Sequence, residues 1–83
     1  MNICAGIVLY NPDAELLKKN VEAALPQVGK IVFVDNASSN VDDLRNMFCG
    51  DQFKWIVNNE NKGISGALNQ LMEFADNNGY AFV

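Results

Sequence analysis

A single carboxylate stands where an apolar segment of the chain turns polar. Residues 31–34 (Ile-Val-Phe-Val) are all apolar, and Asp35 follows them at the start of a largely polar segment, residues 36–40. This pattern predicts a buried parallel strand that carries Asp35 to its C-terminal end. Because ligands of open α/β sheets bind beyond these strand ends, Asp35 is the first candidate for a ligand-binding group. The alternative is an Asx turn or a helix cap, which are common roles of aspartate after a strand.

Two further polar segments follow stretches that we predict to be strands. Tyr10 and Asn11 close the first apolar stretch, and residues 58–63 (Asn-Asn-Glu-Asn-Lys-Gly) follow the third, residues 53–57. In a parallel sheet, the loops after these strands lie at one edge. Together they offer aromatic, carboxylate, amide and hydroxyl groups, which suit a base and a ribose. Structural roles are the alternative, with Tyr10 at the rim of the core and Asn11 as a helix cap.

Apolar stretches alternate with segments of helical periodicity. The stretches that we predict to be strands are residues 3–10, 30–35, 53–57 and 80–83. A short helix is predicted over residues 42–48, and the apolar stripe from Ile64 to Ala75 predicts a longer helix that packs this whole stripe into the core. The alternation predicts an α/β fold: a three-layer, Rossmann-like parallel sheet of about four strands with helices on both faces.

The first helix is predicted between the first two strands. We expect Asn11 to cap it and Pro12 to occupy its first position, where a missing N–H is harmless. We expect Pro26 and Gly29 to end it. Its apolar face comprises Leu17, Val21, Ala24 and Leu25.

The composition is that of one small domain. The 83 residues carry a net charge of −4 and no cluster of Lys or Arg, which argues against DNA or RNA binding. The chain has no histidine, which excludes His-based acid–base catalysis and argues against a transition-metal site. No apolar run reaches the ~20 residues of a membrane span, and no signal peptide is present, so we expect a cytoplasmic protein. Cys4 and Cys49 lack the spacing of a zinc site or a disulfide framework.

Three segments, in this order, carry a resemblance to one enzyme family. They are residues 5–12 (AGIVLYNP), 31–38 (IVFVDNAS) and 59–69 (NENKGISGALN), and they span nearly the whole chain. A strand ending in Tyr-Asn, a strand ending in Val-Asp-Asn-x-Ser, and Asn-x-Gly-x-x-x-Ala-x-Asn opening a helix resemble the N-terminal half of a family 2 glycosyltransferase with the GT-A fold. The rhamnosyltransferase-like branch is the most similar. The resemblance implies the strand order 3-2-1-4 with right-handed crossovers.

The resemblance implies nucleotide-binding roles for residues of all three segments. Asp35 would accept a hydrogen bond from the N–H of a pyrimidine base, and Asn69 would anchor the loop before its helix. Many relatives have Arg where this chain has Leu68, so Lys62 is the nearby cation that could replace it. The residues that the resemblance places at the nucleotide are Tyr10, Asn11, Asp35, Asn36, Ser38, Asn61, Lys62, Gly63, Gly66 and Ala67.

The resemblance also implies a reaction, in which a sugar such as rhamnose passes from a dTDP- or UDP-sugar donor to a polysaccharide or lipid-linked acceptor. The metal-binding Asp-x-Asp of the family follows the fourth strand, so Mg²⁺ or Mn²⁺ is expected only in the full-length enzyme. We therefore expect residues 1–83, as a single truncated domain without a cofactor, a metal site or a catalytic residue, to be inactive alone. The full-length enzyme would act in the cytoplasm, at the inner face of the membrane. The edge at residues 80–83 would favour self-association.

Two other classes of protein stay open. A Rossmann-like enzyme that uses a nicotinamide or a methyl donor needs glycines directly after the first strand, where this chain has Tyr-Asn-Pro-Asp at residues 10–13. Gly63 and Gly66 instead follow the third predicted strand. The remaining alternative is a non-catalytic, flavodoxin-like nucleotide-binding module.

Overall fold

Strands and helices alternate along the whole described chain, as predicted. The computed structural model describes residues 2–82, and Val83 of the predicted last strand lies outside them. The elements are β1 (Asn2–Leu9), α1 (Ala14–Val28), β2 (Ile31–Asn36), α2 (Val41–Met47), β3 (Phe53–Asn58), α3 (Gly63–Asn78) and β4 (Tyr80–Phe82). The chain is therefore an α/β protein, and each predicted element is present within a few residues of its expected bounds.

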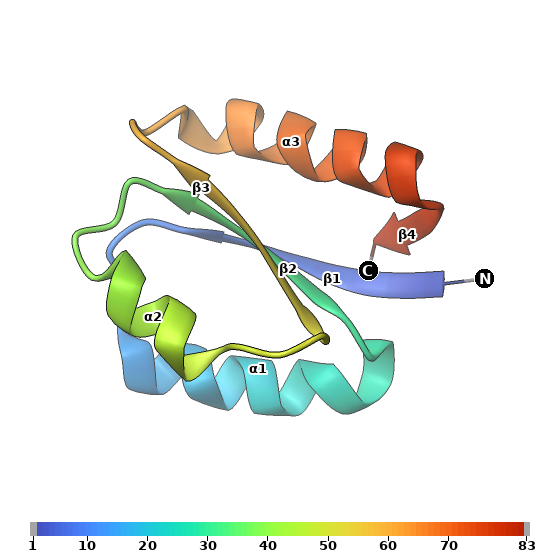
Figure 1. Ribbon diagram of the computed structural model, residues 1–83, viewed down its shortest axis with the longest axis horizontal. Helices are drawn as coiled ribbons and strands as arrows, with labels where there is room; N and C mark the ends of the chain where they lie inside the picture. Colours follow the sequence, from blue (N-terminus) through green and yellow to red (C-terminus); the bar gives the residue numbers. More distant parts are fainter. Residues whose placement is uncertain (1, 83) are drawn as a thin grey trace.

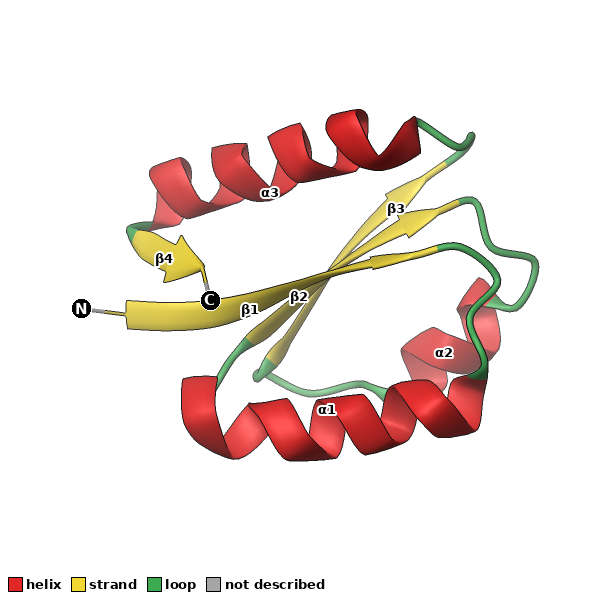
Figure 2. Cartoon of the chain, turned by 180° about the vertical axis from the view of Figure 1, so that it is seen from behind, coloured by secondary structure: helices red, strands yellow, loops and turns green. Residues whose placement is uncertain are grey.

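The strands form a 4-stranded sheet in the order β3-β2-β1-β4. Every pairing in it is parallel, which confirms the predicted topology. At the C-terminal edge, Leu9 pairs with Asp35, and Asn36 pairs with Asn58. Figure 2 shows the loops that leave β1, β2 and β3 side by side at this edge. The polar segments of the sequence are thus brought together as expected.

The core has two parts, one on each face of the sheet. Figure 1 shows α1 and α2 covering one face and α3 covering the other. Alternate residues of β2 point to opposite faces, so Ile31 and Phe33 pack with α1 and α2, whereas Val32 and Val34 pack with α3. All six residues of β2 are buried, which explains its unbroken apolar run.

The ends of α1 differ from those predicted. Asp13, not Asn11, is the N-cap, and its Oδ1 accepts hydrogen bonds from the backbone N–H groups of Glu15 and Leu16 at 3.0 and 3.1 Å. The helix also continues through Pro26, because that residue lies in the last turn, where a lost N–H removes only one late hydrogen bond. The helix ends, as predicted, at Gly29, whose φ of 76° is left-handed.

The apolar stripe of α3 is only partly in the core. Ala67, Leu71 and Ala75 are buried against the sheet, but Ile64, Leu68 and Met72 are 64, 48 and 62% exposed. The prediction that the whole stripe is core is therefore wrong. The exposed residues follow one another at intervals of four and lie on a flank of the helix, because an apolar stripe of this width exceeds the arc that one helix buries against a sheet.

Candidate functional site

The loops after β1 and β2 are hydrogen-bonded into one unit. The backbone N–H of Asn11 donates to Ser38 Oγ at 2.8 Å. In return, Asn11 Oδ1 accepts from the backbone N–H of Ser39 at 2.8 Å and from Ser39 Oγ at 3.2 Å. Asn40 Nδ2 donates to the carbonyl oxygen of Pro12 at 3.4 Å. The side chain of Asn11 thus holds the loop after β2. Its oxygen is engaged there and does not cap α1, whose N-cap is Asp13.

Asp35 is fully buried at the end of β2, and its two carboxylate oxygens have different surroundings. Oδ2 accepts a hydrogen bond from the backbone N–H of Ser38 at 2.8 Å. This bond closes a tight turn in which Ala37 has a left-handed φ of 63°. Among the described residues Oδ1 has no hydrogen-bond partner, although it is buried. A buried acceptor without a partner is costly, so Oδ1 can accept from a donor that a ligand supplies.

A network of buried amides joins the ends of β2 and β3 to α3. Asn58 Nδ2 donates to Asn36 Oδ1 at 2.9 Å and to Gln70 Oε1 at 2.9 Å. Gln70 Nε2 donates back to Asn58 Oδ1 at 2.8 Å. Asn36 Nδ2 donates to the carbonyl oxygen of Gly63 at 3.3 Å, and Asn36 Oδ1 also accepts from the backbone N–H of Lys62 at 3.4 Å. The network therefore reaches the backbone at the start of α3.

The structure explains both glycines at the start of α3, one by its backbone conformation and the other by lack of space. Gly63 has a left-handed φ of 72°, and its N–H donates to Asn61 Oδ1 at 2.8 Å in an Asx turn. A Cβ on Gly66 would lie 2.9 Å from the Cβ of Lys62, closer than real side chains approach. These residues shape a tight entry into α3 beside the buried end of β2.

The structure places the predicted site residues along the edge formed by the ends of β1, β2 and β3. Asp35, Asn36 and Ser38 are buried there. The exposed members of the set are Tyr10, Asn11, Asn61, Lys62 and Gly63, while Gly66 is half-buried. Ala67 differs from these residues because it packs in the hydrophobic core between α3 and the sheet.

Asn58 and Gln70 are absent from the predicted site, and Asn69 is not the anchor. Asn69 is exposed, whereas Gln70, one residue later, holds Asn58. The sequence contains a signal, because Gln70 lies three residues after Ala67 of the apolar stripe and therefore on the same side of the helix. A polar side chain at such a position needs a partner, but the pattern does not show which residue provides it.

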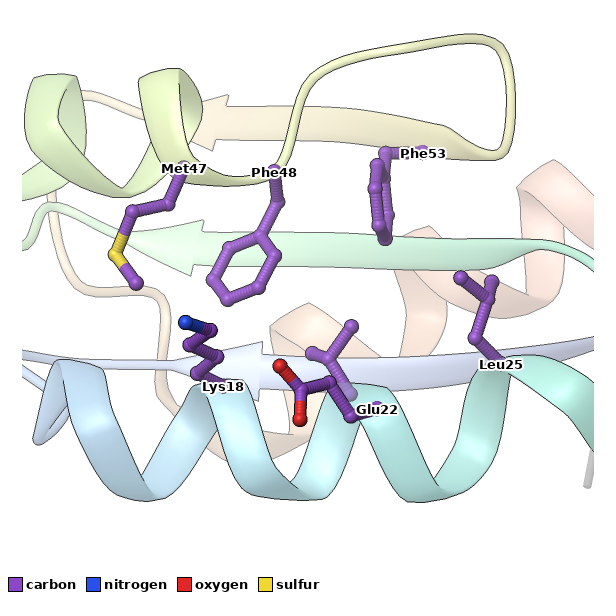
Figure 3. A pocket seen from close by; sticks show the side chains of 7 residues that line it. Lys18, Glu22, Leu25, Met47, Phe48 and Phe53 are labelled. Carbon is purple, nitrogen blue, oxygen red and sulfur yellow. The ribbon is translucent and has the colours of Figure 1, made fainter.

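A hollow lies away from the predicted site, between α1 and the segment that joins α2 to β3. Figure 3 shows its walls, with Phe48 and Phe53 on one side and Lys18, Glu22 and Leu25 of α1 on the other. Its volume is about 300 Å³. No residue of the predicted site lines this hollow.

The described part of the chain has no cluster of metal-binding side chains and no helix that could cross a membrane. It does not bring three His, Cys, Asp or Glu side chains together in a group that could hold a metal ion. None of the helices described here is long and apolar enough to cross a membrane.

The fold and the polar edge define a Rossmann-like α/β domain that presents its candidate site at the C-terminal ends of the strands. The model of one protein family, described as glycosyl transferase family 2, matches residues 4–83. The chain therefore belongs to glycosyl transferase family 2, as its motifs predict, and this family supports a role in sugar transfer with a nucleotide-sugar donor. No curated protein sequence and no solved structure matches the chain significantly.

Proposed function

We propose that the polar edge binds the pyrimidine nucleotide of a dTDP- or UDP-sugar, with Asp35 as the group that recognises the base. The observation that carries this proposal is the buried Oδ1 of Asp35, which has no partner among the described residues. Uracil and thymine each present an N–H donor at N3 between two carbonyl groups. A base inserted here would donate that hydrogen to Oδ1 while Oδ2 keeps its bond from Ser38.

The surrounding residues suit the other parts of such a ligand. Tyr10 is 59% exposed beside the Asp35 loop, so its ring is free to stack on a base. Asn61 and Gly63 form a small, polar turn that suits a ribose, and the exposed Lys62 is a cation for the phosphates. The bound loops of Asn11 and Ser38 hold this edge in place before a ligand arrives.

The finer assignments come from the family resemblance and belong to the same proposal. They are a donor such as dTDP-rhamnose, a polysaccharide or lipid-linked acceptor, Mg²⁺ or Mn²⁺ in the full-length enzyme, and a cytoplasmic location at the inner membrane face. We also propose that residues 1–83 bind the donor but do not transfer its sugar alone. The chemistry that this chain supplies is then recognition and orientation of the nucleotide.

The role of Asp35 is tested by titrating the chain with UDP and CDP, and following the backbone amide signals by NMR. Cytosine has an acceptor at N3 where uracil has a donor, so CDP should bind at least about tenfold more weakly than UDP. The variant Asp35→Asn keeps the shape of the side chain but has only one accepting oxygen. Its NH₂ group therefore faces either the base, which it cannot accept from, or the N–H of Ser38, whose hydrogen bond is then lost. It should bind UDP at least about tenfold more weakly and lose most of the preference over CDP.

The matched control is Asp51→Asn, the same change at an exposed residue at the opposite end of the sheet. It should leave both affinities unchanged, so a loss confined to Asp35→Asn reflects the base site rather than net charge. Equal binding of UDP by the wild type and Asp35→Asn, in a folded variant, would place the ligand elsewhere and overturn the proposal.

A further inference from the structure

In the amide network beside the proposed base site, each side-chain nitrogen and oxygen makes at least one hydrogen bond. Asn58 donates through Nδ2 to both Asn36 and Gln70, and its Oδ1 accepts from Gln70. The pair Asn58–Gln70 is a reciprocal amide dimer, in which each side chain both donates and accepts. Such an arrangement fixes the orientation of each amide, because turning any one of them would bring like groups together.

The direction of the network is set by the backbone at the start of α3. Asn36 Oδ1 faces the N–H of Lys62, and Asn36 Nδ2 faces the carbonyl oxygen of Gly63. Because the oxygen of Asn36 faces Asn58, Asn58 presents its Nδ2 to it. This orientation leaves Asn58 Oδ1 to accept from Gln70 Nε2. The side chain of Gln70 is therefore linked through Asn58 and Asn36 to the backbone N–H of Lys62 and the backbone carbonyl of Gly63.

This backbone segment at Lys62 and Gly63 lies next to the proposed site. Asn36 is the residue next to Asp35, and Lys62 and Gly63 border the Asx turn of Asn61. Gly63 has a left-handed φ of 72°, a backbone conformation that glycine adopts readily because it has no Cβ. A network that holds Asn36 and this turn together thus fixes the distance between the base-recognising loop and the entry into α3.

We propose that Asn58 and Gln70 are positioning residues for nucleotide binding: they hold the turn at residues 61–63 against the Asp35 loop without touching the ligand. This inference rests on the proposed function of the edge. It assigns a role to the only pair of side chains in the described structure that is joined by reciprocal amide hydrogen bonds. Gln70 is partly buried and lies on the sheet-facing side of α3, so its effect on a ligand passes through Asn58 and Asn36.

The variant Gln70→Glu turns this dependence into a pH switch. A protonated glutamic acid can replace glutamine in the dimer, because its O–H donates to Asn58 Oδ1 and its carbonyl oxygen accepts from Asn58 Nδ2. An ionised glutamate accepts only, so it leaves Asn58 Oδ1 without a donor. The ordinary pKa of glutamate is about 4.3, and partial burial should raise the pKa of the introduced carboxyl.

The experiment measures UDP and dTDP binding by the whole chain at about pH 5 and about pH 8, on either side of that raised pKa. At the lower pH, Gln70→Glu should bind like the wild type. At the higher pH, its affinity relative to the wild type should fall about tenfold, in line with one broken, partly buried hydrogen bond. Taking the ratio to the wild type at each pH removes the effect of phosphate ionisation on the ligand.

The matched control is Gln52→Glu, the same chemical change at an exposed position. Gln52 directly precedes the N-terminal end of β3, whereas Asn58 is at the C-terminal end. Its ratio to the wild type should be the same at both pH values. If the ratio for Gln70→Glu is also the same at both pH values while the wild type binds, the network does not position the site and the inference is wrong.

A readout without ligand separates this inference from the proposed function. The backbone N–H of Lys62 donates into the network, so its hydrogen exchange, corrected for intrinsic pH dependence, should become faster in Gln70→Glu at the higher pH only. If the wild type binds neither UDP nor dTDP, the proposed function is wrong and the role in binding is lost with it. Faster Lys62 exchange would then still show that Gln70 holds the turn, and unchanged exchange would overturn that as well.

Discussion

At the scale of single residues, the carboxylate of Asp35 has a structural role in addition to the base-binding role that we propose for it. Oδ2 closes a turn with the N–H of Ser38, three residues on, and Oδ1 is buried without a partner in the described structure. The two interpretations of the sequence, a turn and a ligand group, are therefore compatible because they concern different oxygens. The fully buried state of Asp35 follows from the burial of its strand, which the apolar run before it indicates.

The two cysteines should differ sharply in reactivity. Cys4 is fully buried in β1, and burial raises the pKa of its thiol above the ordinary value of 9.0, although Lys30 opposes this shift. Cys49 is exposed. Because the thiolate is the reactive form, we expect a thiol reagent at about pH 8 to modify Cys49 quickly and Cys4 only after unfolding. Mass spectrometry of the native and denatured chain measures this, and Cys49→Ser should abolish the fast reaction. Fast double labelling of the native chain would contradict the burial of Cys4.

The raised pKa of Cys4 also makes the free energy of unfolding depend on pH. The folded chain holds the Cys4 proton more tightly than the unfolded chain, so this contribution is fully present below pH 9.0 and is lost as the pH rises through the raised pKa. The free energy of unfolding should therefore decrease more steeply above pH 9.0 in the wild type than in Cys4→Ala. Chemical denaturation at several alkaline pH values measures the slope. The comparison of slopes is independent of the constant loss that the smaller side chain causes.

At the scale of secondary-structure elements, periodicity predicts the type of each element but not how much of it is covered. The spacing of Ile64, Leu68 and Leu71 predicts a helix, and α3 forms, yet only Leu71 of these residues is buried. Which flank of an amphipathic helix meets the sheet depends on the crossing of helix and strands, which no local pattern contains. For the same reason the N-cap of α1 falls on Asp13 rather than on Asn11, whose side chain makes contacts 28 residues away along the chain.

The two leucines of α3 give a direct test of this placement. Leu71 is 5% exposed and Leu68 is 48% exposed on the same helix. Leu71→Ala should lower the free energy of unfolding by about 2–4 kcal/mol, because it leaves a cavity against the sheet. Leu68→Ala should lower it by less than about 1 kcal/mol, since its side chain already meets solvent. Urea denaturation of both variants measures the difference. Equal losses would mean that the exposed flank of α3 is covered in solution.

The candidate site divides between what strand order predicts and what only the three-dimensional structure shows. The alternation of strands and helices is enough to bring Tyr10, Asp35 and Asn61 to one edge, because parallel strands all end there. The partnership of Asn58 with Gln70 depends on the rotation of α3 over β3 and on the orientation of two amides. Such pairings are set by packing and have no local signature, so the sequence indicates that a partner is needed without naming it.

At the scale of the whole molecule, the described residues form a unit with the compactness of a globular domain. The radius of gyration is 12.0 Å, close to the roughly 12 Å expected for a compact chain of this length. The sheet nevertheless has two edges, because β3 and β4 each pair with a neighbour on one side only in the described structure. An open edge offers unpaired backbone groups to another chain, so the two edges deserve comparison.

The two edges differ in their protection. β3 has an exposed charged residue, Lys54, as its second residue, and charges of this kind discourage pairing between strands of different molecules. The sequence of β4, Tyr-Ala-Phe, has no charge. Among the described residues, β4 is paired only with β1, through Asn2–Tyr80, Ile3–Ala81 and Cys4–Phe82. The β4 edge is therefore the one at which we expect two copies of the 83-residue chain to associate.

Introducing a charge at this edge tests the expectation. The wild-type chain should show a sedimentation coefficient that rises over about a hundredfold range of concentration, because association follows mass action. Ala81→Lys should remove most of this rise, since a lysine on an edge strand opposes pairing. Ala23→Lys adds the same charge at an exposed position of α1 and should associate like the wild type, which separates the edge from net charge. A wild-type chain that stays monomeric throughout, with backbone amides of β4 that exchange slowly, would show that this edge is protected within the monomer.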